Sequence, residues 1–291
     1  MSETVPFTLQ TPAALLHGLA DLPDEPGERP AVVICHGFKG FMEWGFFPAL
    51  AALLAERGYV AVRFNLSGTG MRPGDELVTD PDAFRANTYS RELAELLAVL
   101  DATGESIAPG RVDRGRIGLL GHSRGGGDAL LAAASPAWRD RLRALVTWAA
   151  IADVDRFTPA QKEEWRRSGE LPVANARTGQ QLALGAGLLA DIEERGPELD
   201  LLAAAASRRA PWLIVHGAED ESVPVAEAHR LAGSAAGRAE LLVVPGASPY
   251  LRQPPPLRRP HPAAHPGPER HSSVVPRAPV RVIPHPGSGP R

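Results

Sequence analysis

The chain has 291 residues, 44% of them hydrophobic, and is long enough to bury the core of one large α/β domain or of two small ones. Its formal net charge of −3 argues against a nucleic-acid partner and against a membrane-surface partner, because both select basic proteins. The single cysteine, Cys35, excludes an internal disulfide and lies in an apolar run typical of an inert core position.

The first ten residues contain neither a basic stretch nor a long apolar stretch, so the sequence predicts no signal peptide. No apolar run reaches the roughly 20 residues that a helix needs to cross a bilayer. We therefore expect a cytoplasmic protein.

Short apolar runs then alternate with segments of helical periodicity. Residues 5–10 and 14–19 predict an opening hairpin, and 31–35 is a continuous apolar run typical of a strand buried on both faces. Further strands are predicted at 59–64, 117–120, 144–151, 211–215 and 241–244, and helices from Phe47 to a stop at Gly58 and over about 87–102, 128–134 and 225–232. This alternation predicts an α/β fold with a parallel sheet, helices on both faces, and ligands at the carboxyl ends of the strands.

The turn after 117–120 reads Gly121-His122-Ser123-Arg124-Gly125 and leads into an Ala- and Leu-rich helix. Strand, tight turn with a serine between glycines, and helix form the signature of a nucleophile elbow. A serine hydroxyl is a weak nucleophile and must stand where a base can reach it, and the strained turn accepts only small residues two positions away. We interpret Ser123 as the nucleophile, with a purely structural glycine-rich turn as the alternative.

Residues from Asp153 to about 206 interrupt the alternation. The sequence predicts helices over 161–167 and 181–194, with no strand between them. One interpretation is a small helical lid over the site, with Trp165 and Leu182 facing the substrate. The other is an ordinary insertion that packs on its own face.

The acidic turn after the strand at 211–215 contains the candidate for the acid that orients the base. Asp220 follows a buried strand at the catalytic edge of the sheet and comes after the serine in chain order. The neighbouring Glu219 and Glu221 compete for this role, and a solvated acidic turn is the alternative.

Two backbone amides are needed to hold the oxyanion of the reaction. The amide of Arg124, directly after the nucleophile, is one candidate, and the amide of Phe38, in the loop after 31–35, is the other. Gly37 and Gly40 leave room for that loop to approach the substrate. His36 could be the base, but its place before the turn favours a role in bracing the loop.

These stretches together resemble the α/β-hydrolase family, specifically its dienelactone-hydrolase-like and prolyl-oligopeptidase-like esterase members. The resemblance covers about residues 5–248 and depends on three segments: residues 36–40, residues 121–125, and His216-Gly217 through Asp220 to Val223-Pro224. It implies an α/β-hydrolase fold with a mostly parallel central sheet. It also implies a Ser-Asp-His hydrolase whose histidine follows the final strand.

The sequence departs from that pattern at the expected histidine. Gly246-Ala247-Ser248 is followed by Pro249, so proline occupies the family's histidine position. Residues 249–291 contain thirteen prolines and, as their one acid, Glu269. This composition excludes the family's final helix and predicts a disordered, Pro- and Arg-rich tail after a hydrolase domain at 1–248.

A shifted reading frame would explain this break. Removing one nucleotide from a back-translation of residues 248–253 restores Ser-His-Thr-Phe-Gly-Ser, with histidine where the family has it. The alternative is a genuine Pro-rich tail, in which a different base, such as one of the tail histidines, acts. The tail histidines are His261, His265, His271 and His285.

The predicted function is that of a serine hydrolase acting on carboxylic esters of small molecules by two-step acyl transfer. Because the histidine is missing, we expect the chain as written to be impaired. The alternatives are a peptidase of the prolyl-oligopeptidase type and a pseudo-enzyme that only binds a ligand. The sequence shows no metal-ligand spacing and no cofactor motif, so we expect neither a metal nor a cofactor.

Overall fold

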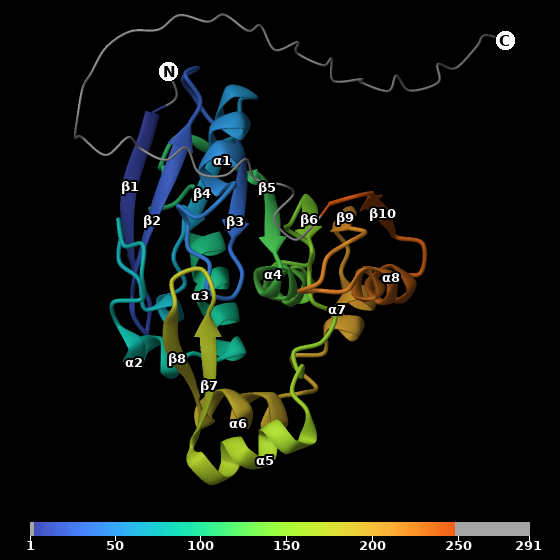
Figure 1. Cartoon of the computed structure of the whole chain (residues 1–291). Helices are drawn as coiled ribbons and strands as arrows, with labels where there is room; N and C mark the ends of the chain where they lie inside the picture. The colour runs from blue at the N-terminus through green and yellow to red at the C-terminus, as the bar shows by residue number, and fades with distance from the viewer. Residues whose placement is uncertain (1–2, 248–291) are drawn as a thin grey trace, which may run out of the picture. The chain divides into compact units, whose positions relative to one another are not determined.

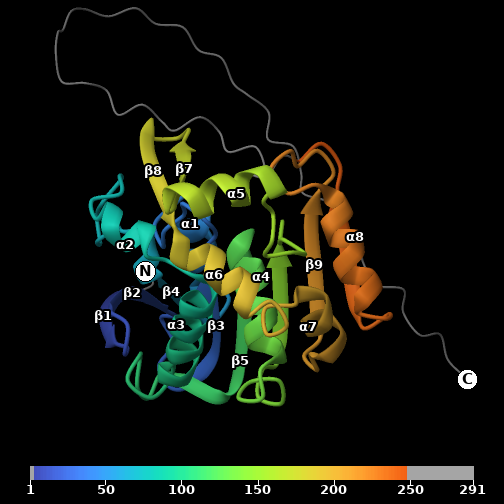
Figure 2. The ribbon, with the colours of Figure 1, turned by 90° about the horizontal axis from the view of Figure 1, so that it is seen from below.

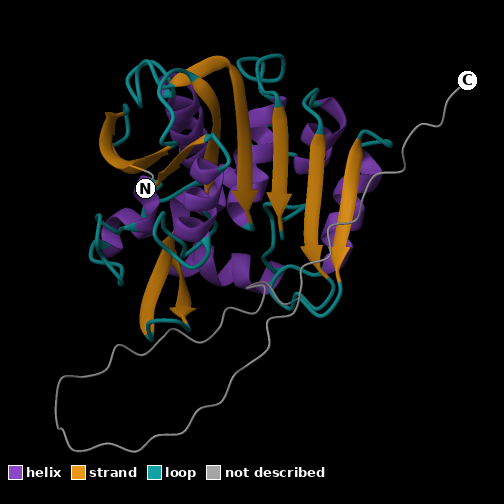
Figure 3. Ribbon diagram, turned by 90° about the horizontal axis from the view of Figure 1, so that it is seen from above, coloured by secondary structure: helices purple, strands orange, loops and turns teal. Residues whose placement is uncertain are grey.

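A computed structural model describes residues 3–247, and its main feature is an eight-stranded sheet within that range (Figure 1). The two strands at the N-terminal edge are antiparallel to their neighbours, and all the others are parallel, with their arrows pointing the same way in Figure 3. In spatial order the strands are β1 (Glu3–Gln10), β2 (Leu15–Leu22), β4 (Val60–Phe64), β3 (Arg29–Cys35), β5 (Val112–His122), β6 (Ala144–Trp148), β9 (Trp212–Gly217) and β10 (Ala239–Val244). The predicted mostly parallel α/β architecture is confirmed.

The sheet is covered on both faces, as predicted. Helix α1 (Phe47–Glu56) packs against Ile34 and Leu120, whereas the neighbouring Val33 and Leu119 belong to the other, larger core cluster. Since successive side chains of a strand point to opposite faces, these two clusters lie on the two sides of the sheet. The larger cluster includes residues of α3 (Tyr89–Ala102), α4 (Arg124–Ala134), α7 (Leu201–Ser207) and α8 (Val225–Ser234).

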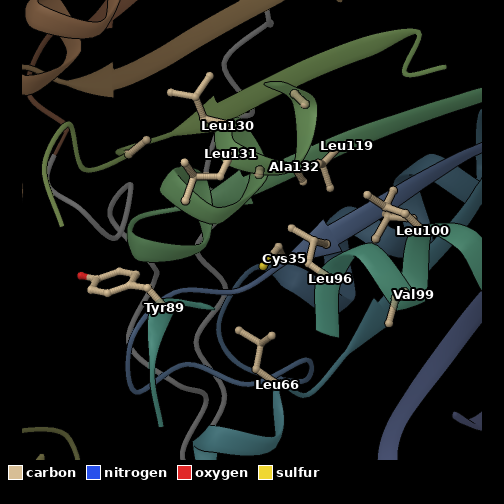
Figure 4. Close-up of a cluster of buried hydrophobic side chains, with 14 of the residues drawn as sticks. Cys35, Leu66, Tyr89, Leu96, Val99, Leu100, Leu119, Leu130, Leu131 and Ala132 are labelled. Carbon is tan, nitrogen blue, oxygen red and sulfur yellow. The ribbon is translucent and has the colours of Figure 1, made fainter. Parts of the chain in front are cut away.

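The larger core is centred on α4, which contacts β3, β5 and β6 (Figure 4). Leu130 and Ala132 of α4 are fully buried and belong to one cluster with Leu96 of α3. Cys35 lies in the same cluster as a free, buried thiol, as the sequence predicts for a core cysteine.

Strands β6, β9 and β10, at the β10 edge of the sheet, are less buried on the face that α1 covers elsewhere. Strand register places Trp148, Val215 and Leu242 side by side in one row. Trp148 and Val215 are half-buried, and Leu242 is 49% exposed. On the opposite face of the same strands Ile214 is fully buried, so the two faces of this end are unequally protected from water.

The insertion at 153–206 differs from the prediction because it contains two strands. Its elements are α5 (Pro159–Ser168), β7 (Glu170–Asn175), β8 (Gln180–Gly185) and α6 (Ala186–Glu194), followed by α7, and they lie together in the view from below (Figure 2). Strands β7 and β8 form an antiparallel hairpin. The leucines at 182, 184, 188 and 189 suggest a single helix, but Gly179, with a φ of +75°, allows the turn that pairs the two strands.

The side chains predicted to face the substrate from this insertion do not do so. Trp165 is fully buried and packs against Phe157, with ring centroids 5.0 Å apart. Leu182 is 7% exposed and belongs to the core cluster. Leu184, two residues further along β8, lines the cavity described below.

The insertion is anchored to the segment that precedes α3, which includes η1 (Ser67–Thr69) and α2 (Pro81–Arg85). The Gln180 side chain binds both backbone groups of Val78, accepting from its N–H at 3.0 Å and donating to its carbonyl at 2.9 Å. The Ser90 amide, in the first turn of α3, donates to the Asp191 carboxylate at 2.9 Å.

The helices found in residues 3–247 include none that combines the length and the apolar character needed to span a membrane.

Two predicted boundaries move at the carboxyl edge of the sheet. Helix α4 begins at Arg124 and not at Asp128, because the three glycines after Arg124 are part of the helix. Strand β6 ends at Trp148 and not at Ile151, because Ala149 turns the chain with a φ of +50°.

Glycines allow α4 to approach the strands. A Cβ atom on Gly121 would overlap the carbonyl oxygen of Gly125, and one on Gly125 would overlap the carbonyl oxygen of His36. Backbone therefore packs directly on backbone where β5 turns into α4, which explains the glycines on both sides of Ser123.

We predict that Gly121→Ala destabilises the protein by about 3 kcal/mol, because the new methyl group displaces α4 from β5. Gly118→Ala, on the same strand, is the matched control: its Cβ would lie 3.6 Å from the Ala144 carbonyl oxygen, an ordinary contact. Urea unfolding of both variants measures the difference, and equal free energies of unfolding would contradict the packing argument.

Candidate active site

Ser123 stands in the turn between β5 and α4. Its φ of 55° and ψ of −122° lie in a region that residues other than glycine rarely adopt. The surrounding backbone holds this conformation: the Ser123 amide donates to the Trp148 carbonyl at 2.9 Å, and the Ser123 carbonyl accepts from the Gly126 amide at 2.9 Å. The residue is half-buried and lines a cavity of about 630 Å³.

The loop after β3 lies against this turn. A Cβ on Gly37 would be 2.9 Å from the Ser123 Cβ and 2.8 Å from the His122 carbonyl oxygen. The next residue, Phe38, lines the cavity together with Arg124. Within residues 3–247 neither the Phe38 nor the Arg124 amide donates to a backbone oxygen. The Arg124 amide is also at the N-terminus of α4, where the helix dipole favours negative charge.

His36 is fixed as a neutral brace of this loop. The Leu66 amide donates to its Nε2 at 3.1 Å, so Nδ1 carries the proton and donates to the Gly37 carbonyl at 3.0 Å. Burial lowers the pKa of His36 to about 4. Both ring nitrogens are occupied in bracing the loop, which agrees with the bracing role and not with a base.

Asp220 is held on the loop after β9. Its Oδ1 accepts from the amides of Ser222 and Val223, at 2.9 and 2.8 Å. Its Oδ2 is buried and has no hydrogen-bond partner within residues 3–247. The carboxylate lines the same cavity as Ser123. The competing acids Glu219 and Glu221 are exposed and are not among the lining residues.

His216 lies beside Asp220, but its hydrogen bond is to the backbone of the loop after β9. Its Nε2 lies 2.7 Å from the Val223 carbonyl, to which it donates, and 3.9 Å from Asp220 Oδ2. The imidazole is fully buried and is not among the residues that line the cavity. It therefore holds the Asp220 loop and does not stand between Asp220 and Ser123.

His122 packs among aromatic rings beside the elbow, with its ring centroid 5.3 Å from that of Phe46 and 6.0 Å from that of Phe47. Pro249, the predicted position of the family's histidine, lies outside the described residues, as do the tail at 249–291, its four histidines and the predicted frameshift. Within residues 3–247 no group of three or more His, Cys, Asp or Glu side chains could hold a metal ion.

The sequence analysis missed a buried polar cluster behind Arg124. The Arg124 Nε donates to Glu92 at 2.5 Å, and its guanidinium lies 3.8 Å from the ring centroid of Tyr89. Asp128, one turn further along α4, is also buried, and desolvation raises the pKa values of both the Asp128 and the Glu92 carboxyl groups. The helix pattern contains a signal for this cluster, because Glu92 shares the buried face of α3 with Leu96 and Val99.

The insertion contributes a wall of the cavity. The end of β7 and the turn that follows, residues 173–177, line it together with Leu184 of β8. Lys39, from the loop after β3, donates from Nζ to the Ala174 carbonyl at 2.7 Å. The insertion is thus in direct contact with the loop that carries the Phe38 amide.

The profile of the alpha/beta hydrolase family matches residues 6–266, and the chain belongs to this family. A 2,6-dihydropseudooxynicotine hydrolase from Paenarthrobacter nicotinovorans is 29% identical over 204 residues, which are 69% of this chain and 47% of that protein. The chain therefore spans about half the length of this relative.

Two further comparisons agree with this assignment. A bis(hydroxyethyl) terephthalate hydrolase from Streptomyces coelicolor is 36% identical over 113 residues, or 38% of this chain and 30% of that protein. The crystal structure of a dienelactone hydrolase from Anabaena variabilis superimposes with a TM-score of 0.58 at 16% identity, covering 87% of this chain and 90% of that one. At that identity the structural likeness shows the fold alone.

We predict that His36 makes the protein less stable in acid. The unfolded chain takes up a proton at this histidine as the pH falls below about 6.5, whereas the folded chain does so only near pH 4, so stability falls as the pH decreases between these values. The contribution is about 3 kcal/mol. His36→Gln, which keeps a side-chain acceptor for the Leu66 amide, should flatten the pH dependence of the free energy of unfolding. His229→Gln, on the exposed surface of α8, controls for the loss of a histidine, and an unchanged slope in His36→Gln would contradict the assignment.

Proposed function

We propose that the chain is a serine hydrolase for carboxylic esters of small molecules, with Ser123 as nucleophile and Asp220 as the acid that orients the base. The observation that carries this proposal is the state of the Asp220 carboxylate. One oxygen is held by two amides, while the other is buried without a hydrogen-bond partner in residues 3–247, in the same cavity as Ser123. A carboxylate in this state is suited to accept the N–H of an imidazole placed between it and the serine.

The proposed reaction has two steps. Ser123 Oγ attacks the ester carbonyl carbon as its proton passes to the base, and the amides of Phe38 and Arg124 donate hydrogen bonds to the oxyanion. The carbonyl re-forms, the base returns the proton to the departing alcohol, and an acyl-enzyme remains. Water attacks that ester in the same way, which releases the carboxylic acid and restores the hydroxyl of Ser123.

The base is the missing component. Proline has no side chain that can accept a proton, and Pro249 occupies the position that the family's histidine would take. Loss of one member of such a triad costs roughly 10⁴- to 10⁶-fold in rate. We therefore propose that the chain as written is impaired, and that a reading frame restoring the histidine encodes an active esterase.

The name of one related protein supports esters as the substrate class, because bis(hydroxyethyl) terephthalate is an ester. The cavity supports a small molecule, because about 630 Å³ is the volume of an ordinary small-ligand site. We further propose a cytoplasmic location, without a nucleic-acid partner.

We predict that a frame-restored chain, in which Ser248 is followed by His-Thr-Phe-Gly-Ser, hydrolyses p-nitrophenyl acetate at least about 10³-fold faster than the chain as written. Ser123→Ala in the frame-restored chain should abolish this gain. Ser222→Ala removes another hydroxyl that lines the cavity and should preserve it. Equal rates for the frame-restored chain and the chain as written would refute the role assigned to the missing histidine.

We predict that the effect of Asp220→Asn depends on the base. In the frame-restored chain this substitution should lower kcat/KM by about 10⁴-fold, because the imidazole loses its acceptor. In the chain as written it should change the rate little, since no imidazole is there to be oriented. Glu219→Gln and Glu221→Gln should be neutral in both backgrounds. A loss of similar size in both backgrounds would show that Asp220 acts through something other than a base at that position.

A further inference from the structure

The cavity is lined by more positive than negative charge. Among the described residues Asp220 is the one carboxylate that lines it, whereas its cationic lining side chains are Lys39, Arg124, Arg156 and Arg177. Asp220 is engaged by backbone amides on one oxygen and is assigned to the base on the other. The lining of the cavity therefore contains more cationic than anionic side chains that could contact a ligand.

Arg124 and Arg156 each have a carboxylate partner that does not line the cavity. Arg124 is paired with Glu92 at 2.5 Å, and Arg156 is paired with Glu227. The partners recorded for Lys39 are different, a carbonyl oxygen at 2.7 Å and the ring of Phe38. Burial lowers the pKa of Lys39, which shows that its charge is partly removed from water. An anion would be stabilised beside this ammonium group.

The Lys39 and Arg124 side chains both lie near the ring of Phe38. The Lys39 Nζ is 5.1 Å, and the Arg124 Cζ 5.5 Å, from the ring centroid of Phe38. Both retain donors: the ammonium group uses one of its three hydrogens on Ala174, and Arg124 Nη2 is buried without a hydrogen-bond partner in residues 3–247. An unsatisfied buried guanidinium nitrogen is costly unless a ligand oxygen accepts from it.

Resting on the function proposed above, we propose that the substrate carries a carboxylate in addition to its ester, and that Lys39 and the Arg124 side chain bind this carboxylate. They are specificity-determining residues of the site. Tyr89, Val173 and Leu184 supply apolar walls for the carbon chain that links the two groups.

A binding measurement on a variant without the Ser123 hydroxyl tests the carboxylate site independently of ester hydrolysis. The full chain carrying Ser123→Ala, which cannot form an acyl-enzyme, is titrated calorimetrically with monomethyl adipate and with dimethyl adipate. The two ligands share the carbon chain and one methyl ester and differ in the carboxylate. We expect the dissociation constant of monomethyl adipate to be at least about tenfold lower, which corresponds to about 1.4 kcal/mol.

Variants then identify the groups that bind the carboxylate. Lys39→Met should remove most of the preference for monomethyl adipate over dimethyl adipate. Lys162→Met is the matched control, because Lys162 is the other lysine of the chain and lies on α5, where it pairs with Asp155. Arg124→Lys keeps the oxyanion amide and a partner for Glu92 but loses the planar fork, so it should reduce the preference; its thermal unfolding is measured in parallel.

Equal dissociation constants for the two adipates, binding of neither, or a preference that survives in Lys39→Met would overturn the proposal. Labelling of Ser123 by a fluorophosphonate in the frame-restored chain reports the hydrolase function separately. Labelling without anion preference would refute the carboxylate site alone. Anion preference without labelling would refute the hydrolase and leave a binding protein for carboxylates.

Discussion

The close approach of α4 to the carboxyl ends of β3 and β5 is the constraint on which the rest of the site depends. Gly121 and Gly125 let backbone contact backbone, and this contact turns the chain so sharply that Ser123 adopts a positive φ. The same approach places Gly37 against the Ser123 Cβ, so the loop of Phe38 reaches Ser123. A serine and two amide donors thus meet because of packing between glycines, and the strain at the serine is held by the surrounding hydrogen bonds.

Local contacts hold the Asp220 carboxylate in place and leave one of its oxygens without a hydrogen bond in residues 3–247. Its geometry is set by local hydrogen bonds from Ser222 and Val223 and by His216 behind it. None of these contacts uses Oδ2, which therefore remains for a partner. Asp220 thus offers a buried acceptor of the kind that the imidazole of the proposed function would use.

The insertion at 153–206 both lines the cavity and contacts the loop after β3. Its hairpin lines the cavity, and its Ala174 carbonyl accepts from Lys39, next to the proposed oxyanion amide of Phe38. Charge on the walls of the cavity comes from the loop after β3, from α4, from the insertion and from the loop after β9. The buried carboxyl group of Glu92 behind Arg124 holds the guanidinium. In the proposed function, substrate selection and acyl transfer would share residues, since Lys39 and the Arg124 side chain directly adjoin the proposed oxyanion amides in the chain.

The sequence by itself determined the parallel α/β core, the elbow around Ser123 and the acidic turn of Asp220, because hydrophobic period and glycine spacing are local properties of the chain. Only the tertiary structure decided that residues 170–185 form a hairpin, that Trp165 is buried against Phe157, and that Asp220, not Glu219 or Glu221, faces the cavity. The leucines of β8 and α6 fit a helix as well as a strand followed by a helix, and pairing across the Gly179 turn chose between them. Pairing, burial and the charge partners of Lys39 and Arg124 depend on segments far apart in the sequence, which a local pattern does not contain.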